Sequence, residues 1–268
     1  MSNIAKAFEK KSSDGKNRAA FIGFVTGGDP TIEKSEEFIL EMLRAGADLV
    51  EIGIPFSDPI AEGPVIQAAN IRALKNGATV EKIFGLVESL RKKTETPLVF
   101  LTYLNPVFHY GYEEFFTKCQ SVGLDGIIIP DLPFEEQAEV RDAASRHGVD
   151  LISLIAPTSE ERVREIAKTA SGFIYLVSSM GVTGVRSEIK TDLGSIIASI
   201  KDVTKNAAVK IPVAVGFGIH TPAQAAEIGK IADGVIVGSA IVKIVEKYGE
   251  EAGEHIYQYV KEMVGVLE

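Results

Sequence analysis

Apolar residues gather in eight short runs along the chain, separated by stretches in which apolar residues recur every three or four positions. The runs cover residues 19–25, 48–54, 97–103, 125–130, 149–156, 172–178, 211–216 and 233–238. The segments between them, such as 35–46 and 135–148, have the periodicity of amphipathic helices and end in glycine. A strand followed by a helix, eight times over, predicts a sheet of parallel strands.

Two architectures accommodate this order, a doubly wound open sheet and a closed barrel, and the glycine positions favour the barrel. The segment after the first run, GFVTGGDPT, does not match the G-x-G-x-x-G pattern of dinucleotide-binding sheets. Glycines instead follow the seventh and eighth runs, in VGFGI and VGSAI, where barrel enzymes commonly bind a phosphate. We therefore predict an α/β fold, a (β/α)₈ TIM barrel.

The length of 268 residues suits one such barrel, so we expect a single domain over residues 1–268. Ile4 and Phe8, four residues apart, predict a short amphipathic helix at the N-terminus. The interval between the second and third runs is long enough for an extra helix within residues 76–94.

Composition and charge narrow the classes of function. The chain is 46% hydrophobic and 24% charged, which is typical of a globular protein. Its net charge is −9 and no segment concentrates Lys and Arg, which argues against nucleic acid and anionic membranes as partners. The sequence has no apolar stretch of signal-peptide or membrane-spanning length, so we expect a cytoplasmic protein.

Glu51 is a charged residue inside the apolar run 48–54. Alternation along a strand places it on the face of Leu49 and Gly53, opposite Val50 and Ile52. Burying an ionised carboxylate without a partner costs several kcal/mol, so the alternatives are a buried ion pair and a functional carboxyl. Because none of the eight runs contains Lys or Arg, we favour a functional carboxyl with a raised pKa, suited to general acid or base catalysis.

Two further carboxylates, Asp58 and Glu62, follow in the loop FSDPIAEG, which would cross the mouth of the barrel. Asp58 precedes a proline and fits an Asx-type turn or helix cap as well as a functional role. Glu62 fits the solvated first turn of the next helix or a second functional carboxylate.

The late glycine loops predict an anion site built from backbone groups. Glycine lets the main chain approach a ligand closely, and the N–H groups of Gly238 and Ser239 would lie at a helix start, where the dipole favours an anion. The alternative is ordinary turn chemistry at strand ends. A long glycine-containing loop over residues 178–194 is either a lid or a solvated insertion.

Other chemistries lack their residues. A Schiff-base aldolase needs a strand-borne lysine, and a metal-dependent enzyme needs clustered ligands, whereas the four histidines are scattered. The single cysteine, Cys119, lies in a predicted helix and is expected to be a buried thiol. Acid and base chemistry by carboxylates on a small phosphate ester remains.

Four segments, VEIGIPFSDPIAEGP, YLVSSMGVTGVR, VGFGI and VGSAIV, together resemble the tryptophan synthase α subunit family over essentially the whole chain. The resemblance implies a (β/α)₈ barrel that cleaves indole-3-glycerol phosphate to indole and glyceraldehyde 3-phosphate. It implies no cofactor in this chain, and a partner β subunit that carries pyridoxal phosphate, in an αββα complex. The alternatives are a free-standing indole-glycerol-phosphate lyase and a mainly regulatory barrel subunit.

The resemblance also implies roles for individual residues. Glu51 matches the general acid/base, and Glu62 stands where the family normally has the aspartate that stabilises positive charge on the indole ring. Phosphate contacts match Gly184, Gly218, Gly238 and Ser239. The indole pocket matches Phe24, Leu101, Tyr103, Ile128, Leu154, Tyr175 and Phe217. Lid and interface positions match Asp58, Pro59, Asn105 and Thr183, and Pro130 replaces a residue that is usually small.

Overall fold

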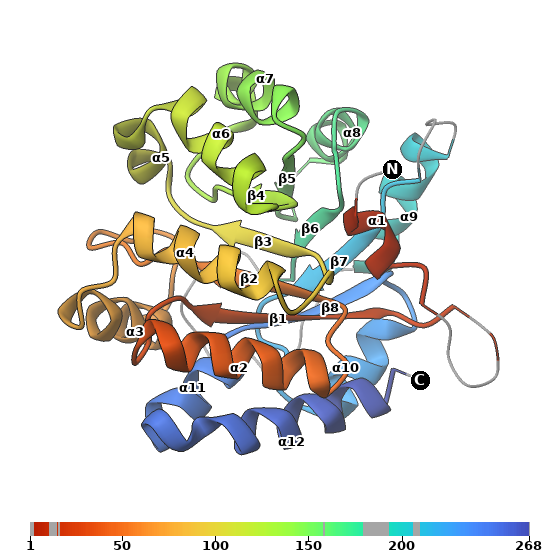
Figure 1. Cartoon of the computed structure of the whole chain (residues 1–268). Coiled ribbons are helices and arrows are strands. Elements are labelled where there is room, and N and C mark those ends of the chain that lie inside the picture. The colour runs from red at the N-terminus through yellow and green to blue at the C-terminus, as the bar shows by residue number, and fades with distance from the viewer. Residues whose placement is uncertain are drawn as a thin grey trace.

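Eight parallel strands close into a barrel in the order of the chain, with β1 paired to both β2 and β8 (Figure 1). The computed structural model describes residues 3–10, 15, 17–157, 159–178, 193–205 and 210–267. The strands are β1 (Ala20–Thr26), β2 (Leu49–Gly53), β3 (Leu98–Leu101), β4 (Gly126–Ile128), β5 (Asp150–Ile155), β6 (Ile174–Val177), β7 (Val213–Gly216) and β8 (Gly234–Val237). Each strand overlaps one predicted run, and the pairing of β1 with β8 confirms the closed barrel over the open sheet.

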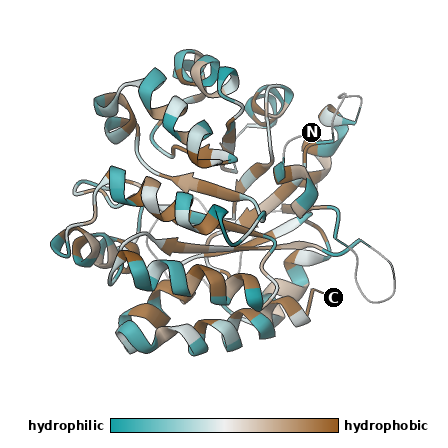
Figure 2. Ribbon diagram, in the orientation of Figure 1, coloured by the Kyte–Doolittle hydropathy of each residue, from teal (hydrophilic) through white to brown (hydrophobic). Residues whose placement is uncertain are grey.

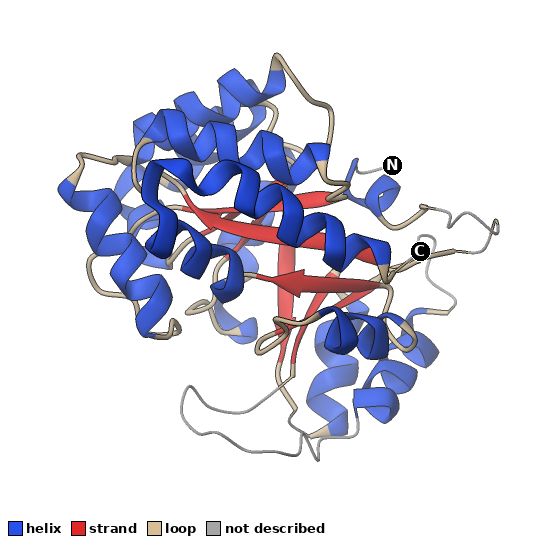
Figure 3. Ribbon diagram, turned by 90° about the horizontal axis from the view of Figure 1, so that it is seen from below, coloured by secondary structure: helices blue, strands red, loops and turns tan. Residues whose placement is uncertain are grey.

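Helices surround the barrel (Figure 3). They are α1 (Asn3–Ala7), α2 (Ile32–Arg44), α3 (Pro64–Lys75), α4 (Val80–Arg91), α5 (Leu104–Tyr110), α6 (Tyr112–Val122), α7 (Ala138–Arg146), α8 (Glu160–Lys168), α9 (Leu193–Thr204), α10 (Pro222–Gly229), α11 (Ser239–Tyr248) and α12 (Ala252–Gly265), with short 3₁₀ helices at Phe134–Glu136 and Gly249–Glu251. The extra helix expected within residues 76–94 is α4. It begins after Thr79, whose hydroxyl accepts a hydrogen bond from the Lys82 N–H.

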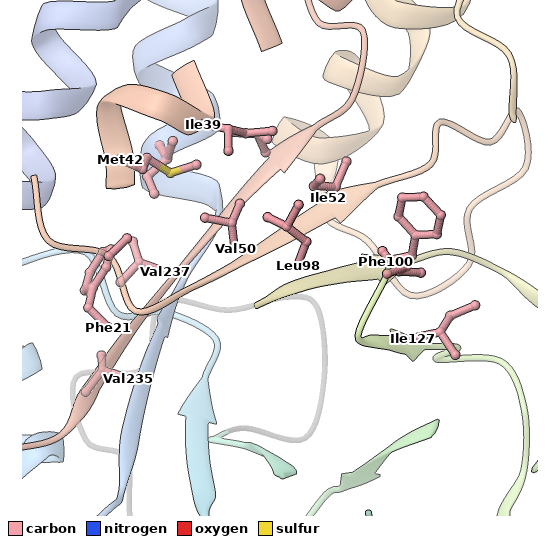
Figure 4. Close-up of a cluster of buried hydrophobic side chains, with 14 of the residues drawn as sticks. Phe21, Ile39, Met42, Val50, Ile52, Leu98, Phe100, Ile127, Val235 and Val237 are labelled. Atoms are coloured by element: carbon pink, nitrogen blue, oxygen red, sulfur yellow. The ribbon is translucent and has the colours of Figure 1, made fainter. Parts of the chain in front are cut away.

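Hydrophobic side chains form two layers of core. The larger layer lies between the outer faces of the strands and the helices, as the brown inner surfaces of the ribbon in Figure 2 indicate. Figure 4 shows part of it, where Phe21, Val50 and Leu98 from neighbouring strands lie near Ile39 and Met42 of α2. Burial of this surface is the main favourable term in folding.

The smaller core layer fills the inside of the barrel, and it fixes which way β2 faces. Leu49 belongs to the inner cluster, whereas Val50 and Ile52 belong to the outer one. Glu51 therefore points inward, as alternation along the strand predicts, and its backbone pairs in register with Phe24 of β1 and Val99 of β3.

The inner cluster is closed from below by α1, which lies at the end of the barrel where β1 begins (Figure 1). Ile4 is fully buried in this cluster, and the ring centroid of Phe8 lies 5.7 Å from that of Phe173. The predicted amphipathic N-terminal helix is thus a plug, which leaves the opposite end of the barrel open for a site.

Two further expectations concern the burial of Cys119 and the absence of membrane-spanning segments. Cys119 is buried, and that burial raises the pKa of its thiol. Within the described ranges, no helix combines the length and apolar character needed to cross a membrane.

Candidate active site

A cavity of about 890 Å³ opens at the carboxyl ends of the strands, the end at which (β/α)₈ barrels carry their active sites. Glu51 and Glu62 both line it. So do five of the residues expected at an indole pocket and three of those expected at a phosphate site: Phe24, Leu101, Leu154, Tyr175, Phe217, Gly218, Gly238 and Ser239. Strands far apart in the sequence thus bring most of the predicted site residues to one hollow.

Glu51 lies at the buried end of this hollow, with 1% of its surface exposed. Among the described residues, its Oε1 atom has no hydrogen-bond partner. Burial raises the pKa of Glu51 to about 8, because the surroundings offer the charged form nothing to replace water. The carboxyl is therefore mostly protonated at neutral pH and can donate a proton.

Glu62 lines the same cavity from the loop between β2 and α3, just before Gly63, the N-cap of α3. Its Oε2 atom accepts a hydrogen bond of 2.7 Å from Nδ2 of Asn70. Burial raises the pKa of Glu62 to about 7, and the hydrogen bond from Asn70 partly offsets the rise. At neutral pH a substantial fraction of Glu62 is ionised, while Glu51 is mostly not.

Tyr103 was expected in the indole pocket, but its hydroxyl holds the loop that carries Glu62. The Ala61 N–H donates to Tyr103 Oη at 3.0 Å, and the ring packs 5.4 Å from that of Phe56. Tyr103 is 1% exposed and is not among the residues that line the cavity. Its burial raises its pKa to about 12, so the phenol keeps its proton.

Apolar side chains form most of the remaining wall. Phe24, Leu101 and Leu154 project from β1, β3 and β5 into the hollow. Tyr175 and Phe217 meet edge to face with centroids 6.2 Å apart, an arrangement favoured between aromatic rings. Ile128 is fully buried in the inner cluster, in register with Leu101, and is not among the cavity-lining residues.

Backbone groups at the ends of β7 and β8 face the same cavity. Phe217 and Gly218 both have left-handed backbone conformations, with φ values of 73° and 80°. Such a conformation is uncommon for phenylalanine, and Ser178 helps to hold it by donating its hydroxyl to the Phe217 carbonyl at 2.7 Å. Gly238 is the N-cap of α11, so the unpaired N–H groups of its first turn begin at the cavity.

The remaining predicted residues lie at the rim or outside the described ranges. Asp58 is exposed and Pro59 is partly buried in the loop after β2. Asn105, near the start of α5, lines a second hollow of about 520 Å³ together with Phe56 and Pro106. Thr183 and Gly184, like most of the expected lid over 178–194, lie outside the described residues.

The cavity also has polar residues that the sequence did not indicate. Arg162, at the start of α8, lines it and forms an ion pair with Glu135. Lys243 lines it from α11, four residues after Ser239 and so about one helical turn along the same face. That spacing could have signalled Lys243 once Ser239 was taken as a helix start. Pro130 lies in the wall.

Among the described residues, no group of His, Cys, Asp and Glu side chains has the arrangement of a metal site. The described polar groups at the cavity include two carboxyls, backbone N–H groups and the cationic side chains of Arg162 and Lys243.

Known proteins are similar to this chain in both sequence and fold. The family model described as tryptophan synthase alpha chain matches residues 10–267. The tryptophan synthase alpha chain of Lacticaseibacillus casei is 47% identical over 263 residues, covering 98% of this chain and 94% of that protein. That of Lactiplantibacillus plantarum is 49% identical and covers 94% of both.

Solved structures agree. One from Aquifex aeolicus VF5 has a TM-score of 0.88 at 36% identity and covers 100% of both chains. One described as the tryptophan synthase α2β2 complex of Pyrococcus furiosus has a TM-score of 0.84 at 37% identity, covering 92% of this chain and 98% of that one. By sequence over nearly its full length, and by structure, the chain belongs to the tryptophan synthase alpha chain family.

Proposed function

We propose that this chain cleaves indole-3-glycerol phosphate to indole and glyceraldehyde 3-phosphate, with Glu51 as the acid and base and Glu62 as the charge-stabilising carboxylate. The observation that carries the proposal is the buried carboxyl of Glu51, 1% exposed and with a pKa of about 8, in the wall of an apolar cavity. A carboxyl protonated at neutral pH is what a proton transfer to an aromatic carbon requires.

The reaction balances with these two groups. Protonated Glu51 gives its proton to indole C3, which places positive charge on the ring, and Glu62 offsets that charge at the ring N–H. Glu51, now a carboxylate, takes the proton of the glycerol hydroxyl next to the ring. The carbon–carbon bond breaks, its electron pair returns to the indole ring, and the hydroxyl carbon becomes the aldehyde. The enzyme ends in its starting protonation state.

The rest of the cavity suits the two ends of this substrate. Phe24, Leu101, Tyr175 and Phe217 offer apolar and aromatic surface to a flat indole ring. The backbone at Gly218 and the start of α11 offer N–H donors to the phosphate. This division explains how a chain with a net charge of −9 can bind a phosphate ester without a basic surface.

The indole passes to a β subunit, with which the chain forms a complex. The solved relative from Pyrococcus furiosus is described as an α2β2 complex, which favours this role over that of a free-standing lyase. Exposed apolar side chains are available beside the active-site loop, since Ile60 is 76% and Phe108 66% exposed. We propose that they, with Asp58, Pro59 and Asn105, form part of the surface that meets the partner.

Four further expectations belong with this proposal. Because the mechanism needs only proton transfers, we propose that this chain holds no cofactor and that pyridoxal phosphate is bound by the β subunit alone. We also propose that one barrel domain over residues 1–268 forms the whole catalytic unit, that it works in the cytoplasm, and that Thr183 and Gly184 serve the lid and the phosphate site.

The test is an assay of indole release from indole-3-glycerol phosphate by the purified chain, with and without added β subunit. We expect Glu51→Gln to lower kcat by roughly 10² to 10⁴-fold, the usual contribution of a general acid or base, with little change in KM. Equal indole release by the wild type and Glu51→Gln would overturn the assignment of Glu51. Turnover unaffected by β subunit would favour the free-standing lyase.

A further inference from the structure

Asn70 is a buried polar residue on the core-facing side of α3, and it has no part in the proton transfers of the proposed reaction. It is 3% exposed and shares its helix face with Ile66, Ala69 and Ala73. A polar side chain among apolar ones is destabilising unless it is hydrogen-bonded, and Asn has a low helix propensity. The sequence therefore places an unfavourable residue here, and its hydrogen bond to Glu62 indicates why.

That contact is the hydrogen bond of 2.7 Å from Asn70 Nδ2 to Glu62 Oε2. The donor sits in the middle of a twelve-residue helix, Pro64–Lys75, whose backbone is fixed, whereas the acceptor belongs to a loop. Two other bonds hold the backbone of that loop: Ala61 N–H to Tyr103 Oη at 3.0 Å, and Gln67 Nε2 to the Glu62 carbonyl at 2.8 Å. Of these three hydrogen bonds, only the one from Asn70 is made to the carboxylate of Glu62.

We propose that Asn70 is a positioning residue that fixes the carboxylate of Glu62 in the cavity, in its ionised form, through this hydrogen bond. The inference rests on the proposed role of Glu62 in the reaction. Asn70 would then affect the substrate only indirectly, through the position and charge of Glu62.

The length of Glu62 makes such a support necessary. Glutamate has one more rotatable bond than the aspartate expected here from the family resemblance, so its carboxylate can reach more positions and loses more entropy when held in one. A displacement of about 1 Å at a reacting group can cost on the order of 100-fold in rate. A donor on a rigid helix selects one position for the longer side chain.

The hydrogen bond from Asn70 also favours the ionised form of Glu62. An amide N–H stabilises a carboxylate more than a carboxylic acid, so it lowers the pKa that burial raises. Other titratable or charged groups line the same cavity: Glu51 on β2, Arg162 on α8, His220 after β7 and Lys243 on α11. The phenol of Tyr103, after β3, is affected by the charges of both Glu62 and Asp131, the latter after β4.

The experiment measures kcat for indole release against pH, with the β subunit present, for Asn70→Ala, Asn70→Asp and a matched control, Gln67→Ala. Since Glu62 works ionised and Glu51 protonated, the wild type should have a bell-shaped profile. Loss of the donor should move the acid limb of Asn70→Ala to higher pH and lower kcat at pH 7 by about 10-fold or more. Gln67→Ala, which loses a bond to the Glu62 backbone, should keep the limb of the wild type.

Asn70→Asp separates positioning from packing. Aspartate preserves the volume of asparagine but, once ionised, cannot donate and repels Glu62. We expect its acid limb to move at least as far as that of Asn70→Ala. If Asn70 served packing alone, the Asp variant would resemble the wild type and the Ala variant would lose thermal stability without a shifted limb, which would overturn the proposal. Asn70→Ala keeps the test decisive where the buried aspartate prevents folding.

A double mutant distinguishes this inference from the proposed function. In a Glu62→Ala background, adding Asn70→Ala should change the residual kcat by less than about 2-fold, because the side chain that accepts the hydrogen bond from Asn70 is gone. An effect as large as in the wild type would refute the action through Glu62. If Glu62→Ala is as active as the wild type, the role of Glu62 fails first. If Glu62→Ala is inactive while Asn70→Ala matches the wild type at all pH values, only the role of Asn70 fails.

Discussion

Glu51 and Glu62 are the same amino acid in two different surroundings. Glu51 projects from a strand into the interior of the barrel, where burial alone raises its pKa to about 8. Glu62 lies in a loop beside a buried amide donor, and its pKa of about 7 reflects burial partly offset by that donor. Environments that separate the pKa values of two carboxyls in this way allow one to act as an acid while the other stays ionised.

The burial of Glu51 should appear in the stability of the protein. Its pKa rises from 4.5 to about 8 on folding, so the folded chain holds a proton that the unfolded chain loses between these values. The free energy of unfolding therefore falls as pH rises from 4.5 to 8, by on the order of 5 kcal/mol, and the loss is nearly complete above 8. Glu51→Gln, which cannot ionise, should be increasingly more stable than the wild type across this window.

Urea unfolding of both proteins at several pH values measures that difference. Tyr175→Phe serves as a comparison, because it changes a neighbouring buried side chain without removing the carboxyl. A stability difference between Glu51→Gln and the wild type that stays constant from pH 5 to pH 9 would contradict the expectation.

The length of the side chain at position 62 should matter for rate. Glu62→Asp withdraws the carboxylate by one methylene and takes it out of reach of Asn70, so we expect kcat to fall by about 10 to 100-fold. Glu62→Ala should fall further, since it removes the charge as well. Steady-state indole release checks both variants. An unchanged rate for Glu62→Asp would mean that the loop adapts to either carboxylate.

At the scale of elements, α1 contributes to stability at the end of the barrel opposite the site. Ile4 is fully buried in the inner cluster, next to residues of several strands. Ile4→Ala should lower the free energy of unfolding by about 2–4 kcal/mol, through lost transfer energy and the cavity left behind.

The same variant should leave the pH profile of indole release unchanged, because the hydrophobic layers of the barrel separate α1 from Glu51. Urea unfolding and the activity assay together test this. Lys6→Ala, a change on the same helix without loss of core contacts, is the matched control. A large fall in kcat with no fall in stability would show that α1 serves the site directly.

The elements were predictable where the pattern of burial is local. Eight apolar runs became eight strands because strands of a parallel barrel are buried on both faces, and the helical periodicity within residues 76–94 became α4 because a helix is buried on one face. The roles of Tyr103 and Asn70 were not predictable in this way. Tyr103 holds Ala61 across 42 positions, and Asn70 reaches Glu62 across a loop and two helical turns, so each contact depends on how the loop folds back.

At the scale of the whole molecule, the loop after β2 joins the active site to an outer surface. It carries Glu62 at the cavity, while Ile60 in the same loop is 76% exposed, and Phe56 lines a hollow shared with Asn105 of α5. Phe108, also on α5, is 66% exposed. A partner seated on this surface would contact the same loop that positions Glu62, which offers a route from β-subunit binding to catalysis.

Phe108→Asp should therefore weaken the complex with the β subunit by about 10-fold or more, because it places a charge at the centre of a proposed apolar contact. Analytical ultracentrifugation of the mixed subunits measures the change. Activity of the isolated chain should stay the same, since Phe108 does not line the cavity. Ile231→Asp, a similar change at a side chain that is 40% exposed after α10, should leave assembly intact.

The sequence by itself determined the order of strands and helices, the inward direction of Glu51 and the glycine-rich ends of the seventh and eighth strands. These features follow from local rules, since alternation and turn conformations depend on neighbouring residues. Only the tertiary structure decided that Tyr103 anchors a loop, that Ile128 does not line the pocket, and that Lys243 and Asn70 join the site. A cavity is enclosed by side chains from many strands, and distances between them arise only when the barrel closes.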